Sequence, residues 1–247
     1  MEKLSKFAEE EEMISVCMTT YNGKRFLDQQ LTSILQQLKP EDEVLISDDG
    51  SSDGTRALLQ QFEAQDARIH LFDGPQKGVI ANVAFVLSKA RGDILFLADQ
   101  DDYWLPNRVK SMLAAFDSHP DVQIVLADLA IVDDQGTIIH PSYFALRQVK
   151  VGKWQTLIKN GFIGAGMAIT SQLRDKALPF PPNIPMHDMW LGMLADKNVY
   201  LLKEPLTYYR RHANNVSEIA TTASFTQKFR WRWHLFWAYV WRKSRKK

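Results

Sequence analysis

The sequence contains little or nothing of several features, and each shortage excludes a class of protein. Its 247 residues include a single cysteine, Cys17, so an internal disulfide framework and a multi-cysteine zinc site are both excluded. No run approaches the roughly 18 apolar residues that a membrane-spanning helix needs. The 30 basic residues nearly balance the 29 acidic ones. A net charge of +1, with no recognisable nucleic-acid-binding motif, argues against a nucleic-acid partner.

Three motifs that mark other enzyme classes are also missing. The chain has no G-x-G-x-x-G after its first predicted strand and no G-x-x-x-x-G-K-[ST], which argues against a dinucleotide oxidoreductase and a P-loop NTPase. It has no G-x-S-x-G nucleophile elbow. Cys17 lies inside a predicted buried strand, where a thiol is an inert core group rather than a nucleophile. Residues 1–12 are polar and acidic, the reverse of a signal peptide, so we expect a cytoplasmic protein.

The first hundred residues alternate short apolar runs with helical patterns. The runs that we predict as strands are residues 14–18, 44–46, 69–72 and 94–98. Between the first two, Leu27, Leu31, Ile34 and Leu38 recur at the spacing of one helix face. Strands that are apolar on both faces and separated by helices indicate right-handed βαβ crossovers and a parallel sheet. The fold class is therefore α/β, with a less regular half after residue 120 that includes a hairpin turn at residues 133–136.

Acidic clusters follow the second and the fourth predicted strands. Ligands bind at the carboxyl ends of the strands in an open α/β sheet, and the cluster at residues 99–102 holds three carboxylates. A divalent cation would relieve the repulsion among them, and the alternative is a solvated acidic loop. Asp48 and Asp49 could accept hydrogen bonds from a nucleobase or a ribose, and the alternative there is a turn that caps a helix.

Two further polar clusters occur in the second half of the chain. Asp188 is a candidate general base, because a carboxylate needs only a positioned hydroxyl to act on. Arg210, Arg211 and His212 could face a diphosphate. The alternatives are a helix N-terminus at Asp188 and surface cations at the others.

Together these motifs resemble family 2 glycosyltransferases in content and order over about residues 13–216. The motifs are Thr20-Tyr21-Asn22, Asp48-Asp49-Gly50-Ser51-Ser52-Asp53-Gly54-Thr55, Asp99-Gln100-Asp101-Asp102-Tyr103-Trp104, His187-Asp188-Met189-Trp190 and Tyr209-Arg210-Arg211-His212. The third and fifth are most similar to bacterial rhamnosyltransferases of surface polysaccharide synthesis. The resemblance implies a GT-A fold: a mostly parallel nucleotide-binding sheet flanked by helices, a less regular acceptor-side half and a C-terminal helix.

The resemblance also implies a role for each matching residue. The nucleotide-sugar would be bound by Thr20, Tyr21, Asn22, Asp49, Lys77, Asp99, Gln100 and Arg210. Asp101 would hold Mn²⁺ or Mg²⁺, with Asp102 and His212 as further candidates. Asp188 would be the catalytic base. Many relatives have Gly-Cys where this chain has Gly164-Ala165, so acceptor contacts there are left open.

The implied reaction is an inverting, metal-assisted single displacement onto a hydroxyl of a surface polysaccharide or lipid-linked saccharide. The implied donor is dTDP-β-L-rhamnose. One alternative keeps the family with a UDP-hexose or UDP-N-acetylhexosamine donor. A more remote alternative is a non-catalytic module that binds a nucleotide-sugar or a membrane.

The chain divides into an acidic segment at residues 1–12, a catalytic domain at residues 13–220 and a C-terminal helix at residues 221–247. The catalytic domain comprises a nucleotide-sugar-binding half, residues 13–104, and an acceptor half, residues 105–220. The C-terminal segment has four of the seven tryptophans and many basic residues, which suits the cytoplasmic face of the inner membrane. The alternative is a helix packed on the domain.

Overall fold

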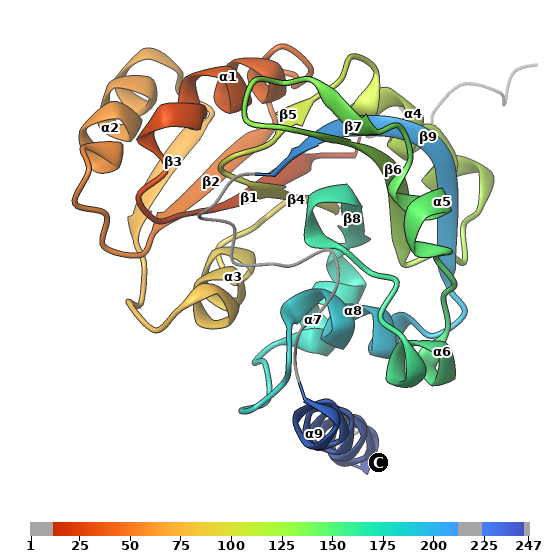
Figure 1. Cartoon of the computed structure of the whole chain (residues 1–247). Helices are drawn as coiled ribbons and strands as arrows, with labels where there is room; N and C mark the ends of the chain where they lie inside the picture. Colours follow the sequence, from red (N-terminus) through yellow and green to blue (C-terminus); the bar gives the residue numbers. More distant parts are fainter. Residues whose placement is uncertain (1–11, 212–223, 245–247) are drawn as a thin grey trace, which may run out of the picture.

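The computed structural model describes residues 12–211 and 224–244 of the chain (Figure 1). In this part of the chain, nine strands form one sheet in the order β3-β2-β1-β4-β8-β6-β9-β5, and β7 pairs with β6. Figure 1 shows helices on both sides of this sheet. The α/β fold class predicted from the sequence is confirmed.

The first half of the sheet is parallel, as the apolar runs predict. Its strands are β1 (Ile14–Thr20), β2 (Glu43–Asp48), β3 (Ile69–Asp73) and β4 (Ile94–Asp99). The connecting helices are α1 (Lys24–Leu35), α2 (Thr55–Gln65) and α3 (Val79–Leu87). Cys17 is buried in β1, and burial raises the pKa of its thiol, as expected of an inert core residue.

The second half of the sheet contains both parallel and antiparallel strand pairs, and longer segments connect its strands. Its strands are β5 (Tyr103–Trp104), β6 (Ile124–Val132), β7 (Ile138–His140), β8 (Met167–Thr170) and β9 (Val199–Arg210). Its helices are α4 (Arg108–Ser118), α5 (Tyr143–Arg147), α6 (Lys153–Ile158), the short 3₁₀ turn Gly164–Gly166, α7 (Ser171–Ala177) and α8 (His187–Ala195). β6 and β9 are parallel to each other, whereas β8 is antiparallel to both β4 and β6. The predicted hairpin is confirmed, since β6 and β7 are antiparallel and the turn closes with a hydrogen bond from Asp133 N to Thr137 O.

Each face of the sheet has its own apolar core. Leu31 of α1, Leu59 of α2 and Met112 of α4 belong to the core on one face. Val86 of α3 and Trp190 of α8 belong to the core on the other. Burial on both faces explains why the strands are nearly continuous apolar runs rather than alternating ones.

The C-terminal helix α9 (Phe225–Ser244) packs on the second face and also carries an exposed aromatic stripe. Leu235 is buried in the core beside α8, and Arg242 donates hydrogen bonds to the carbonyls of Lys176 and Leu178 at the end of α7. Phe229, Trp233, Trp237 and Trp241 are exposed and recur every four residues. None of the described helices combines the length and the hydropathy that crossing a membrane requires. Packing on the domain and an exposed face are thus both present in one helix.

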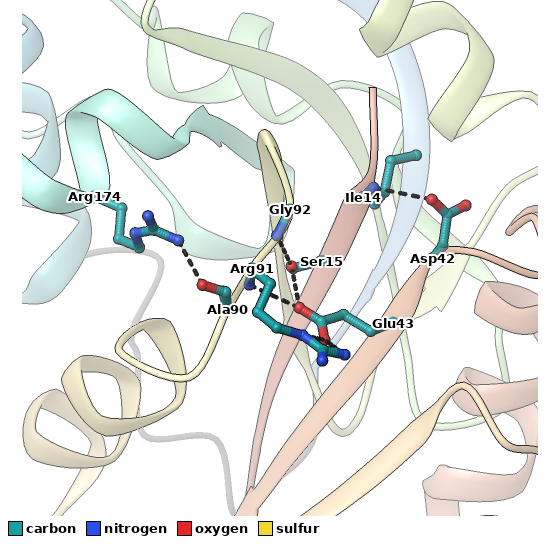
Figure 2. A network of polar contacts seen from close by, with 8 residues as sticks. All are labelled: Ile14, Ser15, Asp42, Glu43, Ala90, Arg91, Gly92 and Arg174. Atoms are coloured by element: carbon teal, nitrogen blue, oxygen red, sulfur yellow. Dashed lines mark hydrogen bonds and ion pairs between the residues drawn. The ribbon is translucent and has the colours of Figure 1, made fainter. Parts of the chain in front are cut away.

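A buried polar network joins the amino ends of the central strands (Figure 2). The Glu43 carboxylate of β2 accepts hydrogen bonds from the Ser15 hydroxyl of β1 (2.6 Å) and from the Arg91 backbone (2.8 Å), and it pairs with the Arg91 guanidinium. Burial opposes ionisation, but the bonds from Ser15 and Arg91 hold the pKa of Glu43 below its usual value. This network fixes the strands at the end opposite to their carboxyl ends.

Candidate active site

The strand register brings the predicted site residues to one edge of the sheet. Thr20 of β1 lies opposite Asp48 of β2, and Thr19 lies opposite Asp99 of β4. The Thr20 hydroxyl donates a hydrogen bond to the Asp48 carboxylate (2.8 Å). Because all three strands are parallel, the loops that follow them meet at this edge.

The Gln100 side chain holds the loop after β1. Its Oε1 accepts a hydrogen bond from Tyr21 N (2.8 Å), and its Nε2 donates one to Tyr21 O (3.0 Å). A side chain on Gly23 would collide with it, because a Cβ there would lie 2.1 Å from Gln100 Oε1. Asn22 has a left-handed backbone (φ 49°) and accepts a hydrogen bond from Ser52 N. Gln100 and Asn22 therefore shape the loop, while the Tyr21 side chain is 59% exposed at the edge.

The Asp49 carboxylate holds the loop that carries Lys77. Its two oxygens accept hydrogen bonds from Gln76 N (2.6 Å) and Gly78 N (3.0 Å). Each carboxylate oxygen has a further lone pair for a ligand. Lys77 lies between these two donors, with its side chain exposed. The Lys77 backbone therefore lies beside the Asp49 carboxylate, and the nucleotide roles of both residues remain predictions.

The buried guanidinium of Arg108 lies within electrostatic reach of the acidic loop after β4, and the sequence did not reveal it. Arg108 is fully buried, stacks over the Trp104 ring (4.5 Å) and donates a hydrogen bond to the Thr207 hydroxyl. Burial lowers its pKa to about 9, an effect that the carboxylates of Asp102 and Asp99 oppose. A single arginine six residues beyond an acidic motif carries no periodic or spacing signal, so sequence reasoning missed it.

Asp102 is the most enclosed of the three carboxyl groups. Its Oδ1 accepts a hydrogen bond from Arg210 N (3.1 Å), and its Oδ2 is buried without a hydrogen-bond partner among residues 12–211 and 224–244. Burial raises its pKa well above the usual value, and the charges of Asp101 and Asp99 raise it further. Asp99 is half-buried, and burial, Asp101 and Asp188 raise its pKa to about 7.

These carboxyl groups fit a divalent cation that is only partly enclosed by protein. Within the described residues, no cluster of three or more metal-binding side chains closes around one point, and His212 lies outside these residues. Mg²⁺ and its relatives are often held by one or two carboxylates together with substrate phosphates. The mutual repulsion around Asp99, Asp101 and Asp102, and the unpartnered Asp102 Oδ2, are what a hard cation would relieve.

Arg210 locks the acidic loop against two other segments. Its guanidinium donates hydrogen bonds to the Asp101 carbonyl (3.1 Å), the Asp134 carbonyl (3.1 Å) and Gln29 Oε1 (2.7 Å), and it lies over the Phe26 ring. Arg210 is 7% exposed. It therefore positions the backbone of the predicted metal ligand, and its contact with a diphosphate remains a prediction.

Asp188 lies in the first turn of α8, buried in an apolar setting. Its carboxylate accepts a hydrogen bond from Met189 N (2.6 Å) and another from the Asn160 side chain. Burial nevertheless raises its pKa to about 7, close to the value that suits a general base. Asp188 thus lies at a helix N-terminus, and its role as the base remains a prediction. Asn160, which follows α6 by two residues, was not predicted from the sequence.

The neighbouring His187 is a packing residue in this arrangement. Its ring is buried, burial lowers its pKa to about 4, and its Nδ1 has no hydrogen-bond partner within the part of the chain that the structure describes. Its Nε2 lies so close to Gly164 that a Cβ there would be 2.8 Å away. The Gly164-Ala165 turn thus supports the start of α8. His187 is therefore neutral at physiological pH, so of these two adjacent residues only Asp188 titrates near neutral pH.

The chain is similar in sequence to several known glycosyltransferases. TuaG of Bacillus subtilis, which carries the name of a teichuronic acid biosynthesis glycosyltransferase, is 27% identical over 211 residues (83% of this chain, 81% of TuaG). The Escherichia coli UDP-Glc:alpha-D-GlcNAc-diphosphoundecaprenol beta-1,3-glucosyltransferase WfgD is 24% identical (76% of this chain, 72% of WfgD). The Shigella flexneri dTDP-rhamnosyl transferase RfbG is also 24% identical (86% and 77%).

A solved structure identifies the fold of the chain, and a family model identifies its family. The crystal structure of Staphylococcus aureus TarS 1–349 in complex with UDP-GlcNAc superposes with a TM-score of 0.65 at 18% identity, over 86% of this chain and 62% of that structure. The chain thus spans about three fifths of that neighbour. The model of the family described as "Glycosyl transferase family 2" matches residues 15–172, more than half of the chain. The sheet has the GT-A fold, with these motifs at its carboxyl edge. The chain belongs to glycosyl transferase family 2.

Proposed function

We propose that the chain is an inverting transferase in which Asp188 is the general base. The observation that carries this proposal is the buried Asp188 carboxyl, whose pKa of about 7 allows it to accept a proton near neutral pH. As its oxygen takes the proton of the acceptor hydroxyl, the hydroxyl oxygen forms a bond to the anomeric carbon. The bond from that carbon to the nucleoside diphosphate breaks, and its electron pair leaves with the diphosphate. One displacement inverts the anomeric configuration.

The carboxylates after β4 prepare the leaving group. Asp101 would hold Mn²⁺ or Mg²⁺, with Asp102 and His212 as further candidates. When bound, the cation supplies positive charge that stabilises the departing diphosphate. Arg210 and Asp102 act on this site through the backbone, because their hydrogen bonds fix the loop on which Asp101 sits.

The donor nucleotide lies across the edge formed by the loops after β1, β2 and β4. In this proposal Asp49 and Lys77 contact the nucleotide beside each other, and the Tyr21 side chain covers it. Thr20, Asn22 and Gln100 hold the loop in place through the hydrogen bonds described above, and Asp99 contacts the ribose side.

For the sugar, we propose L-rhamnose from dTDP-β-L-rhamnose as the first candidate and a UDP-hexose or UDP-N-acetylhexosamine as the second. The name of RfbG supports the first. The name of WfgD and the ligand in the TarS structure support the second. A non-catalytic module is disfavoured. The buried carboxyl group of Asp188 destabilises the folded state when it is ionised, and a protein without catalysis would gain nothing from it.

The acceptor is a saccharide, and we propose that it is lipid-linked and met at the cytoplasmic face of the cell membrane. WfgD, by its name, acts on a diphosphoundecaprenol-linked sugar. The exposed stripe of α9 offers aromatic side chains, and the helix contains basic residues and no acidic one. Aromatic and basic residues together suit an anionic bilayer surface. This proposal makes the protein peripheral rather than membrane-spanning.

A panel of nucleotide sugars tests the enzyme proposal and assigns the donor. Release of the nucleoside diphosphate from dTDP-β-L-rhamnose, UDP-glucose, UDP-galactose and UDP-N-acetylglucosamine is measured with and without Mn²⁺. We expect metal-dependent hydrolysis of dTDP-β-L-rhamnose above the others. Preference for a UDP-sugar would replace the first donor by the second. Tight donor binding without any turnover would support the non-catalytic module.

A further inference from the structure

An apolar hollow of about 630 Å³ lies between α3 and the loop that joins α7 to α8. Ala84 and Phe85 line it from α3, and residues 178–184 line it from the loop. A second hollow of about 430 Å³ lies between the same loop and α9. Pro181 and Pro182 border both hollows. Figure 1 shows α3, α7, α8 and α9 on the same side of the sheet, so the two hollows adjoin at these prolines on that side, and we call them together the path.

The walls of this path favour a hydrocarbon chain over a peptide or a sugar. Pro179, Pro181 and Pro182 have no backbone N–H, so this wall cannot pair with an extended peptide as a sheet edge does. Among residues 12–211 and 224–244, no carboxylate lines either hollow, and aromatic and aliphatic side chains dominate both linings. Pockets of roughly 300–1,000 Å³ with such linings are typical of small-molecule sites.

The path has a basic residue at one end and exposed tryptophans at the other, so a ligand with a charged head and an apolar chain would bind in one direction. Lys77 stands at the α3 end, in the loop that Asp49 ties to the donor edge through Gly78 N. At the other end lie Trp233 and Trp237 of the exposed α9 stripe. A cation therefore stands at the donor side, and interfacial aromatics stand at the side proposed to meet the membrane.

We propose that this path holds the hydrocarbon chain of a single anionic lipid. The lipid's phosphate would lie beside Lys77, whose ammonium has three hydrogen-bond donors and can therefore serve the nucleotide as well, and its chain would run beneath Pro181 and Pro182 toward α9. The proposal rests on the proposed function in that the sugar carried by such a lipid would be the acceptor. The loop that forms the path leads directly into α8 and Asp188, so the head of the lipid would lie between the donor edge and the base.

Binding of alkyl phosphates by calorimetry tests the proposal. Dodecyl phosphate is used below its micellar concentration, beside butyl phosphate and inorganic phosphate. We expect affinity to rise with chain length by up to about fourfold per buried methylene. Equal binding of all three would mean that the protein binds free phosphate only, and it would overturn the chain site.

A variant with a large side chain in the hollow beside α3 gives a second test of the proposal. Ala84→Trp should weaken dodecyl phosphate binding at least about tenfold, whereas Ala57→Trp, the same change at an exposed position of α2, should leave it unchanged. Unaltered binding by a folded Ala84→Trp protein would contradict the proposal. If that variant does not fold, Ser88→Trp at the exposed rim of the same hollow replaces it, with the same expected loss.

Two further readouts separate this proposal from the proposed function. Donor hydrolysis and pelleting with anionic vesicles are measured on the same folded variant, and both should match wild type. If wild-type protein binds dodecyl phosphate but hydrolyses no donor, the enzyme proposal is wrong and the lipid site stands. If it hydrolyses donor normally but its affinity for alkyl phosphates does not depend on chain length, the lipid site is wrong and the enzyme proposal stands.

Discussion

The carboxylate of Asp188 lies near enough to Asp99 to raise the pKa of Asp99, although one comes from α8 and the other from the end of β4. The proposed base and the donor edge are therefore within electrostatic reach across the sheet. In the proposed reaction, the acceptor hydroxyl and the donor sugar would meet between these two groups.

The buried Asp188 carboxyl should make the protein less stable at high pH. Its folded pKa of about 7 lies above the ordinary 3.8, so the folded state binds its proton more tightly, and this contribution is lost as pH rises from about 4 through 7. Asp188→Asn should therefore raise the free energy of unfolding, by about 2 kcal/mol more at pH 8.5 than at pH 5.5, and the melting temperature should rise with it. Thermal scans at both pH values check this, with exposed Asp121→Asn as control. An equal gain at both would contradict the burial argument.

Asp101→Asn should weaken metal and nucleotide binding together. The amide removes one negative charge from the loop after β4, and even residues that only hydrogen-bond to a metal's ligands typically contribute 10–100-fold to metal affinity. Calorimetry of dTDP or UDP with and without Mn²⁺ should show a loss of tenfold or more, confined to the metal-containing titration. Unchanged metal-dependent binding would exclude Asp101 as a ligand.

Glu43→Gln should reduce stability without reducing activity per folded molecule. The change weakens charge-assisted bonds from Ser15 and Arg91, which cost about 1–3 kcal/mol when lost from a buried group. Because the pKa of Glu43 is lowered, the stabilisation should be present near neutral pH and disappear as pH falls toward and below 4. Urea unfolding at pH 7 and pH 4 checks this. A large fall in turnover would mean that both ends of the strands are coupled.

The exposed aromatics of α9 should determine membrane attachment. The double variant Trp233→Ser/Trp237→Ser should lose pelleting with anionic vesicles, and high salt should weaken wild-type pelleting because it screens the basic residues. Removing the whole helix is less informative, since Leu235 and Arg242 pack on the domain. Ile138→Ser/Ile139→Ser, at exposed positions of β7, is the control. Equal pelleting by all three proteins would exclude α9 as the anchor.

Much of the nucleotide half could be predicted from the sequence because its order is local. The four apolar runs and their helical spacers predicted a parallel sheet, which the structure confirms, and the acidic motifs after β2 and β4 predicted that ligands bind at its carboxyl edge. The helix from Leu27 onward ends at Leu35, although Leu38 beyond it is still buried, so the apolar face alone overestimated its length.

The contacts that arise only on folding could not be predicted. Arg108 of α4 donates a hydrogen bond to Thr207 of β9 and is near enough to Asp102 for their charges to interact, and Asn160 reaches Asp188 from beyond the end of α6. Neither residue has a spacing that relates it to its partner. The Gln100 clamp on Tyr21 likewise depends on two loops that meet only when β1 and β4 pair.

The pH dependence of donor turnover by Asp188→Asn, beside wild type, tests the central claim most directly. Single-turnover hydrolysis is measured with the preferred donor and metal, and donor binding is measured by calorimetry on the same proteins. We predict that wild-type turnover rises with pH through about 7, and that the variant binds donor normally but turns over about 10²–10⁴-fold more slowly without this step. Near-wild-type turnover by the variant, with the same pH step, would show that Asp188 is not the base.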